Sequence, residues 1–206
     1  MEKFIKGLKW FLHSYIWLFL LGIILDIVLK NVIVNNMTVG QSIPVINGFF
    51  HITYSVNNAA AFSMGTNNAT INLVMYSVIA TLASAGIVFY LVKCYKKIHP
   101  LFKASLMLIL AGALGNLIDR LCYTPEYLKN PLHERGVVDF IDFCGIWHAI
   151  FNIADVCICV GAGLMILYFI IDEVKSCKSK NNVKVEQKRE LSKTEKEMQN
   201  TENESK

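Results

Sequence analysis

The sequence predicts an all-α membrane protein with four transmembrane helices and a small β-containing extracytoplasmic segment between helices 1 and 2. Hydrophobic residues make up 54% of the 206 residues, and the mean hydropathy is +0.42. Soluble domains are only about 45–50% apolar. The apolar residues also form four separate runs, each close to the ~20 residues that a helix needs to cross a hydrocarbon core. The segments between these runs are polar, and they differ in their content of Lys and Arg.

The four apolar runs predict transmembrane helices over residues 10–29, 74–92, 104–121 and 150–171. The first run follows Lys3, Lys6 and Lys9, and a basic start before an apolar run also occurs in cleavable signal peptides. This run is long for the apolar region of a signal peptide, and no small-x-small cleavage site follows it. An uncleaved first helix is therefore the preferred interpretation.

The polar segments indicate the orientation in the membrane. Segment 31–73 contains no Lys or Arg, and residues 49–54 within it read as a short strand. Segment 122–149 is a mixed loop with only Lys129 and Arg135 as basic residues. Most other basic residues lie at the N-terminus, in the 93–103 loop and after Lys175. Because cytoplasmic segments are enriched in Lys and Arg, both termini are predicted to be cytoplasmic.

Residues 1–174 are predicted to form the membrane domain, and residues 175–206 a polar cytoplasmic tail. The tail is dominated by Lys, Glu, Asn, Ser and Thr, so it lacks the apolar surface to fold alone and is predicted to be disordered. A solvated tail is the simplest interpretation, and contact of its basic beginning with anionic lipid is the alternative.

Three aspartates lie within the predicted spans, where charged residues are costly and usually functional. These are Asp26, Asp119 and Asp155. About 15 or 16 uncharged residues separate each from the nearest charge toward the cytoplasm. At 1.5 Å per residue all three lie about 22–24 Å from the cytoplasmic edge of the core. Asp139, in the loop before the last helix, can reach the same level. The alternative is that each acid is merely solvated among lipid headgroups.

Each acid has polar neighbours at helical spacing. Asp26 and Lys30 are four residues apart and can pair, although Lys30 can also extend outward to the interface. Asn116 shares a face with Arg120, which follows Asp119, and Asn152 lies three residues before Asp155. Amide side chains can orient carboxylates and bind peptide groups. The pattern predicts one carboxylate site near the outer surface of the membrane.

These clusters resemble lipoprotein signal peptidase, also called signal peptidase II, over residues 10–172. Five elements occur in the family's order. Residues 26–30 resemble D-x-x-x-K, residues 57–63 resemble N-x-G-A-A-F/W, residues 111–120 resemble G-G-A-L-G-N-x-x-D-R, residues 137–140 match V-V-D-F and residues 151–155 match F-N-x-A-D. Ala59 and Ala111 replace glycines, and the 121–136 stretch is longer than expected, which would alter access or substrate choice.

The resemblance implies an aspartic endopeptidase of the bacterial cell membrane with Asp139 and Asp155 as the catalytic dyad. Two close carboxylates share one proton, so one can activate water while the other donates a proton. The implied substrate is a prolipoprotein, cut on the N-terminal side of a diacylglyceryl-modified cysteine. The expected partners are such substrates and membrane lipids, with no metal, cofactor or nucleic acid, and the protein is expected to be a monomer.

The resemblance assigns supporting roles to further residues. Substrate positioning or dyad support is expected from Asn57, Asn116, Arg120 and Asn152, while Asp26 and Lys30 would shape the site. Asp119 is the main rival for a dyad position, but the adjacent Arg120 would favour its ionised form, which suits a structural ion pair better.

Other residues and functions are weighed against this interpretation. Asp142 reads as a surface acid, and the lone histidines His51 and His148 lack metal-ligand spacing. Cys122 and Cys144 fall on the same predicted side of the membrane, where they could pair. A small transporter whose acids line a polar path and a structural membrane scaffold are the alternative functions. The inner halves of the spans are nearly uncharged, which disfavours a transporter.

Overall fold

The computed structural model describes residues 2–57, 68–121, 136–144 and 146–204. The chain divides into two units, Met1–Met165 and Ile166–Lys206. The first unit contains the sheet, the bundle and the site discussed below. The second unit is described as the continuation of helix α6 to Glu204. The disorder expected for residues 175–206 stays a prediction.

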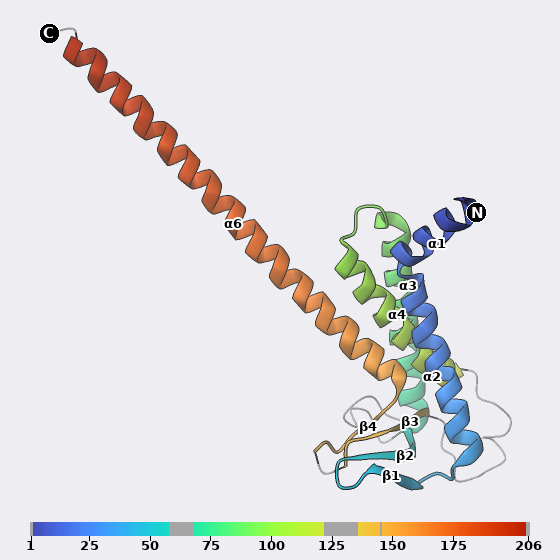
Figure 1. Ribbon diagram of the computed structural model, residues 1–206. Coiled ribbons are helices and arrows are strands. Elements are labelled where there is room, and N and C mark those ends of the chain that lie inside the picture. The colour runs from blue at the N-terminus through green and yellow to red at the C-terminus, as the bar shows by residue number, and fades with distance from the viewer. Residues whose placement is uncertain (1, 58–67, 122–135, 145, 205–206) are drawn as a thin grey trace. The chain divides into compact units, whose positions relative to one another are not determined.

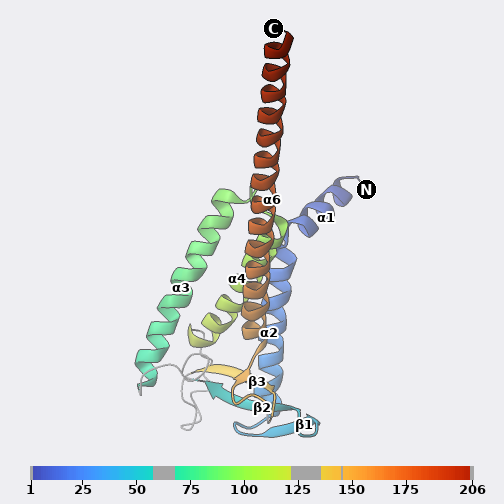
Figure 2. The same cartoon turned by 90° about the vertical axis from the view of Figure 1, so that its left-hand side faces the viewer.

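Four helices are long and apolar enough to cross a membrane within the described part of the chain, as the sequence predicts. They alternate with polar segments, and a short helix, α1, precedes them (Figures 1 and 2). The helices are α1 (Glu2–Ser14), α2 (Ile16–Asn36), α3 (Ala69–Cys94), α4 (Pro100–Leu121) and α6 (Ile153–Glu204).

Most helix boundaries differ from the predicted ones by a few residues or more, and at the start of two spans the structure shows the cause. The first span begins at Ile16 rather than at residue 10, because Tyr15 adopts a left-handed conformation with φ of 60° and ends α1. The last span begins at Ile153 rather than at residue 150, because the two preceding residues, Ile150 and Phe151, pair with a strand. The depth count for Asp26 assumed one straight helix from Lys9, so it does not hold for this acid.

A four-stranded antiparallel sheet lies at the end of the bundle away from α1, in the order β1-β2-β3-β4 (Figure 1). Its strands are β1 (Ser42–Ile46), β2 (Phe50–Asn57), β3 (Val137–Asp142) and β4 (Ile150–Phe151). The strands expected between the first two spans are confirmed. The sheet also includes two strands from the segment that the sequence analysis treated as a mixed loop. The apolar, β-branched start of β3 suits a strand that is buried on both faces.

Small residues allow helices α2, α4 and α6 to approach closely. A Cβ added at Gly112 of α4 would clash with the Ala154 carbonyl and lie 2.6 Å from Ile158 Cγ1, both on α6. A Cβ at Gly22 of α2 would lie 3.0 Å from Ala111 Cβ. Such positions replace side-chain volume by backbone contact, as in other membrane helix interfaces. They bring the first turn of α6 against α4, within reach of α2.

A separate apolar cluster joins the sheet to α2. Its buried members are Ile33 of α2, Tyr54 of β2, and Val138 and Phe140 of β3. Alternate residues of β3 therefore pack into this core, and Asp139 between them points to the opposite face of the strand. The sheet is thus fixed to the same helix that contributes Asp26 and Lys30.

Candidate active site

Asp155 is fixed by the start of helix α6. Asn152, the residue before this helix, accepts a hydrogen bond through Oδ1 from the backbone N–H of Asp155, at 2.9 Å. Asp155 Oδ2 in turn accepts one from the backbone N–H of Asn152, at 3.1 Å. This reciprocal pair is a capping box. The N-x-x-D spacing of Asn152 and Asp155 is typical of a capping box, so this contact could have been predicted. The prediction above used the spacing only to place both residues on one helix face.

Asp139 was expected in a loop, but it lies in strand β3. Its side chain is buried, with the residue 2% exposed. Oδ1 accepts a hydrogen bond of 2.7 Å from Asn152 Nδ2, and Oδ2 accepts one of 3.0 Å from Asn57 Nδ2. Asn57 is the last residue of β2, opposite Val137, so the strand register places its amide beside Asp139.

Two amide side chains connect the carboxyl groups of Asp139 and Asp155. The Asn152 side chain donates to Asp139 and accepts from the Asp155 backbone. Asn116 of α4 donates through Nδ2 to Asp155 Oδ1, at 2.9 Å. The Oδ1 atom of Asn116 accepts from Asn152 Nδ2, at 3.0 Å. The structure therefore brings the two acids and three predicted support residues, Asn57, Asn116 and Asn152, into one cluster.

The environment of Asp139 favours its protonated form. Burial, reinforced by the negative charge of Asp155, raises the pKa of Asp139 to about 7. The hydrogen bonds from Asn57 and Asn152 oppose this shift, because they stabilise the carboxylate. Near neutral pH the Asp139 carboxyl is thus able either to hold a proton or to release it.

Lys30 is the cation at the centre of the cluster. Its ammonium lies 2.7 Å from Asp26 Oδ2 and 2.8 Å from Asp119 Oδ2, and 3.3 Å from Asn116 Oδ1. The predicted Asp26–Lys30 pair is therefore present. The suggestion that Lys30 extends outward to the interface is wrong, because the residue is buried at 3% exposure. Lys30 is also the cation that contacts Asp119, where the sequence analysis considered only Arg120.

Asp26 and Asp119 each hold the backbone next to one member of the candidate dyad. Asp26 Oδ1 accepts a hydrogen bond of 2.8 Å from the N–H of Ala154, which precedes Asp155. A carboxylate at this end of α6 is also favoured by the helix dipole. Asp119 Oδ2 accepts one of 3.1 Å from the N–H of Val138, which precedes Asp139. These contacts favour a positioning role for Asp119 over a place in the dyad.

The remaining candidate residues lie around this cluster. Arg120 donates a 3.1 Å hydrogen bond to the Asn116 carbonyl, and its guanidinium lies 5.7 Å from the centre of the Tyr76 ring. Asp142, at the end of β3, accepts a 2.7 Å hydrogen bond from Thr53 and is half-buried. Residues 58–63 of the second motif and residues 122–135 of the long stretch, which include Cys122, lie outside the described residues. Pairing of Cys122 with Cys144 stays untested.

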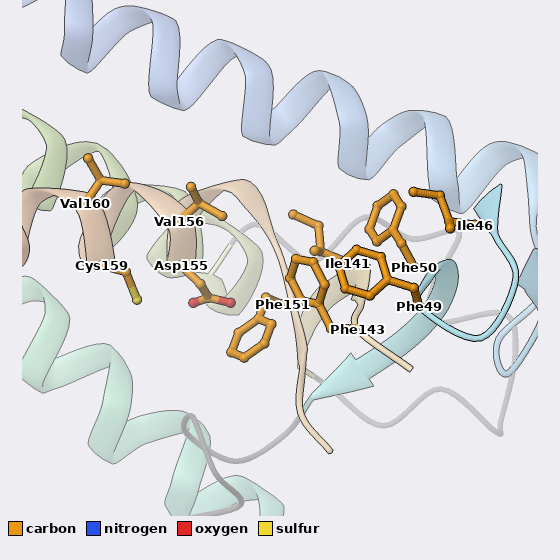
Figure 3. Close-up of a pocket in the computed structure, with 10 residues that line it drawn as sticks. All are labelled: Ile46, Phe49, Phe50, Ile141, Phe143, Phe151, Asp155, Val156, Cys159 and Val160. Carbon is orange, nitrogen blue, oxygen red and sulfur yellow. The ribbon is translucent and has the colours of Figure 1, made fainter. Parts of the chain in front are cut away.

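An apolar cavity of about 500 Å³ opens beside Asp155 (Figure 3). Its lining comes from the sheet, the loop after β3 and the first turns of α6, and Asp155 is the charged residue among the lining residues. Phe143 packs where the β1–β2 turn leads into β2, and its ring centre lies 6.1 Å from that of Phe49 and 5.7 Å from that of Phe50. No local sequence pattern predicts this cavity, because its walls come from segments about 100 residues apart. The residues that line the cavity are Ile46, Phe49, Phe50, Ile141, Phe143, Phe151, Asp155, Val156, Cys159 and Val160.

The fold and the site define a multi-pass membrane protein with a buried carboxylate cluster at one end of its helix bundle. The sequence profile of the family described as Signal peptidase (SPase) II matches residues 18–171. The chain belongs to the signal peptidase II family, a family of bacterial membrane proteases, as the motifs predicted.

Individual proteins show the same likeness. The chain is 40% identical over 156 residues to a lipoprotein signal peptidase of Fusobacterium nucleatum, covering 76% of this chain and 86% of that protein. It is 38% identical over 162 residues to one of Clostridioides difficile, covering 79% and 98%. A solved structure of a bacterial membrane enzyme superposes with a TM-score of 0.64 at 29% identity, covering 78% of this chain and 89% of that one. Helix α1 precedes the part that the family profile matches.

Proposed function

We propose that this protein removes signal peptides from prolipoproteins as an aspartic endopeptidase, with Asp139 and Asp155 as its catalytic pair. The observation that carries the proposal is the bridge through Asn152, which contacts both carboxyl-bearing residues at 2.7 and 2.9 Å. A shared amide of this kind holds two acids in a fixed relation. Two acids in different environments are what acid–base hydrolysis of a peptide bond needs.

The environments of the two acids suggest how they divide the reaction. Asp139, with its pKa raised to about 7 by burial and by Asp155, is the proton donor. Asp155 acts as the base, and it removes a proton from a water molecule that attacks the scissile carbonyl carbon. Asp139 protonates the carbonyl oxygen, which gives a tetrahedral intermediate with two hydroxyl groups. When its C–N bond breaks, the proton taken up by Asp155 passes to the leaving amine, and one hydroxyl returns a proton to Asp139 as the new carboxyl group forms. The hydrogen bonds from Asn116 and Asn152 keep Asp155 oriented through these steps.

The proposed substrate is a prolipoprotein that is cleaved on the N-terminal side of a diacylglyceryl-modified cysteine. The related proteins are named lipoprotein signal peptidases, which supports this substrate class. The apolar cavity next to Asp155 also supports it, because a lipid-modified residue beside the scissile bond needs an apolar surface. The residues assigned to positioning the substrate or supporting the dyad are Asn57, Asn116, Arg120, Asn152, Asp26, Lys30 and Asp119.

We further propose a topology with both termini in the cytoplasm and the sheet on the outer surface of a bacterial cell membrane. The charge pattern supports it, because segment 31–73 contains no Lys or Arg, whereas residues 93–103 contain four Lys. In this orientation the carboxylate cluster lies near the outer leaflet, where a diacylglyceryl group would be embedded. The protein is proposed to act as a monomer among membrane lipids.

The test is cleavage of a diacylglyceryl-modified pre-lipoprotein by the purified full-length protein. Asp139→Asn and Asp155→Asn are each expected to lower the rate by about 10²–10⁴-fold, the usual contribution of a general acid or base. Asp142→Asn is the matched control on the same strand, and it should retain most of the activity. A chelator should have no effect. Near-wild-type cleavage by either dyad variant, or inhibition by the chelator, would overturn the mechanism.

A further inference from the structure

Helix α1 has the residue pattern of a helix with two unlike sides. At helical spacing, positions 4, 5, 8, 11 and 12 fall on one side and are all apolar, while positions 2, 3, 6, 9 and 13 fall on the other and are charged or His. Among the described side chains, Ile5 and Leu12 are 44% and 51% exposed. They are seven residues apart and so lie on the same side, where they form an uncovered apolar stripe with the half-buried Phe11.

The break between α1 and α2 is fixed by specific contacts. Tyr15 has φ of 60°, a left-handed conformation that is unfavourable for a residue with a side chain. Ser14 is 1% exposed, and its hydroxyl donates to the Phe11 carbonyl at 2.6 Å and accepts from the Ile16 N–H at 3.2 Å. Trp17 Nε1 donates to the Leu12 carbonyl, at 3.2 Å. These bonds satisfy backbone groups that a helix break would leave open.

The break at Ser14 and Tyr15, here called the elbow, is also held against the helix bundle. Tyr15 packs on a buried cluster made of Leu91 from α3 and of Leu106, Met107 and Leu110 from α4. Helix α1 leaves the bundle at an angle to α2, at the end away from the sheet (Figure 2). The elbow is therefore a defined turn in the chain.

The length of α2 excludes α1 from the hydrocarbon core. The 21 residues of α2 span about 31 Å, which already matches a core about 30 Å thick. One continuous helix over residues 2–36 would be about 50 Å long, far more than a span needs. Since α2 crosses the membrane by itself, α1 begins where the core ends.

We propose that α1 is an in-plane helix that binds the surface of anionic phospholipid on the membrane face opposite the sheet. Its apolar stripe enters the boundary between headgroups and acyl chains, and its lysines contact the phosphate groups. The charge supports this occupant, since α1 contains Lys3, Lys6 and Lys9 against a single acid, Glu2. Its direct continuity with a membrane span keeps it at this surface. The proposed lipid contact is independent of the family match, because α1 lies before residues 18–171, which the family profile covers.

The first experiment compares the two sides of α1 in the full-length protein. A fluorescent amino acid is incorporated in place of Ile5 or of its neighbour Lys6, and the protein is reconstituted into phosphatidylcholine vesicles with added phosphatidylglycerol. At position 5 we expect strong quenching by brominated acyl chains and weak quenching by aqueous iodide, and at position 6 the reverse. Equal iodide quenching at both positions would overturn the proposal. Protection of position 5 from both quenchers would overturn it too, because it would show a protein contact instead.

The second experiment tests the choice of anionic lipid. Removing phosphatidylglycerol should reduce acyl-chain quenching at position 5, and so should Lys→Gln changes at positions 3, 6 and 9. Each lysine near an anionic surface contributes about fivefold to binding, so the loss should grow with each change. Lys→Gln changes at tail positions 188, 193 and 196 are the charge-matched control and should leave this quenching unchanged. Quenching that does not depend on phosphatidylglycerol or on the three lysines of α1 would overturn the anionic specificity.

Discussion

The oxygen and the nitrogen of the Asn152 side-chain amide have separate roles. Its Oδ1 atom caps the first turn of α6, and its Nδ2 atom donates to Asp139 Oδ1 at 2.7 Å. The same amide also reaches Asn116 Oδ1. The residue is fully buried, so no water replaces these partners at the surface. Its side chain is therefore a direct link between the helix that contains Asp155 and the strand that contains Asp139.

The capping role of the Asn152 oxygen and the donor role of its nitrogen can be separated by substitution. Asn152→Ala should cost about 1 kcal/mol of stability through the lost cap, and about 10²-fold in kcat through misplacement of the acids. Asn152→Ser keeps a capping oxygen but loses the amide donor. It should recover most of the thermal stability while its kcat stays low. If Asn152→Ser also recovered kcat, the residue would act through the helix cap alone.

Asn57 tunes the ionisation of Asp139. Its amide donates to the carboxylate and lowers the pKa of Asp139, which burial and Asp155 raise to about 7. Removal of this donor raises that pKa further. If Asp139 is the proton donor, activity falls as the pH rises through its pKa, so the alkaline limb of the pH–rate profile should move upward in Asn57→Ala.

The measurement is kcat against pH in detergent micelles, with Thr53→Val as the control. Thr53 lies on the same strand as Asn57, but its hydroxyl contacts Asp142 rather than Asp139. The control should leave the alkaline limb in place. An alkaline limb that stays in place or moves downward in Asn57→Ala would contradict the assignment of Asp139 as the proton donor.

At the scale of secondary-structure elements, the site depends on how closely α4 and α6 approach each other. Gly112 faces the Ala154 carbonyl, and Gly161 of α6 faces the Ser105 carbonyl of α4, where an added Cβ would lie only 2.8 Å away. The first turn of α6, with Asp155, is thereby held next to Asn116 of α4. The hydrogen bonds between the helices require this separation, because a donor and an acceptor must lie within about 3 Å.

A single added methyl group tests this packing. Gly112→Ala places a Cβ against backbone and Ile158, which cannot move without separating the helices. We expect a loss of roughly 1–3 kcal/mol of stability and a lower kcat. Gly163→Ala is the matched control on α6, because a Cβ there has no neighbour within 4 Å. This control should be neutral or slightly stabilising in thermal unfolding. Equal stability of the two variants would contradict the close approach of α4 and α6.

At the scale of the whole membrane unit, Lys30 connects the elements that form the site. It lies on α2 and contacts Asp26 on the same helix and Asp119 and Asn116 on α4. Asp26 then binds the start of α6, and Asp119 binds β3. One buried cation thus balances the two acids that hold the backbone beside Asp139 and Asp155, the proposed dyad. Without it, two carboxylates would face each other in a buried environment.

Replacement of Lys30 should therefore affect the entire fold. Lys30→Met is expected to cost about 3–5 kcal/mol of stability, because it leaves buried acids without their cation. Neutralising both acids in the same chain, with Asp26→Asn and Asp119→Asn, should restore much of the thermal stability. Thermal unfolding in detergent measures both effects. An unchanged melting temperature for Lys30→Met would show that Lys30 does not hold these elements together.

The four apolar helices and the spacing of the acids and amides along them could be predicted from the order of the residues alone. The N-x-x-D and D-x-x-x-K motifs each lie within about one turn of helix, and a hydropathic span covers about six. Both patterns therefore consist of residues that are close together in the sequence. The capping box and the Asp26–Lys30 pair are of this local kind.

The way in which these local units meet could not be predicted, because it depends on contacts between distant parts of the chain. Asn57 reaches Asp139 across 82 residues, and Lys30 reaches Asn116 across 86. Such contacts depend on strand register and helix packing, which no local pattern specifies. The strand around Asp139, the burial of Lys30, the break at Tyr15 and the apolar cavity beside Asp155 all belong to this group. Each arises because segments far apart in the chain exclude water from the same space.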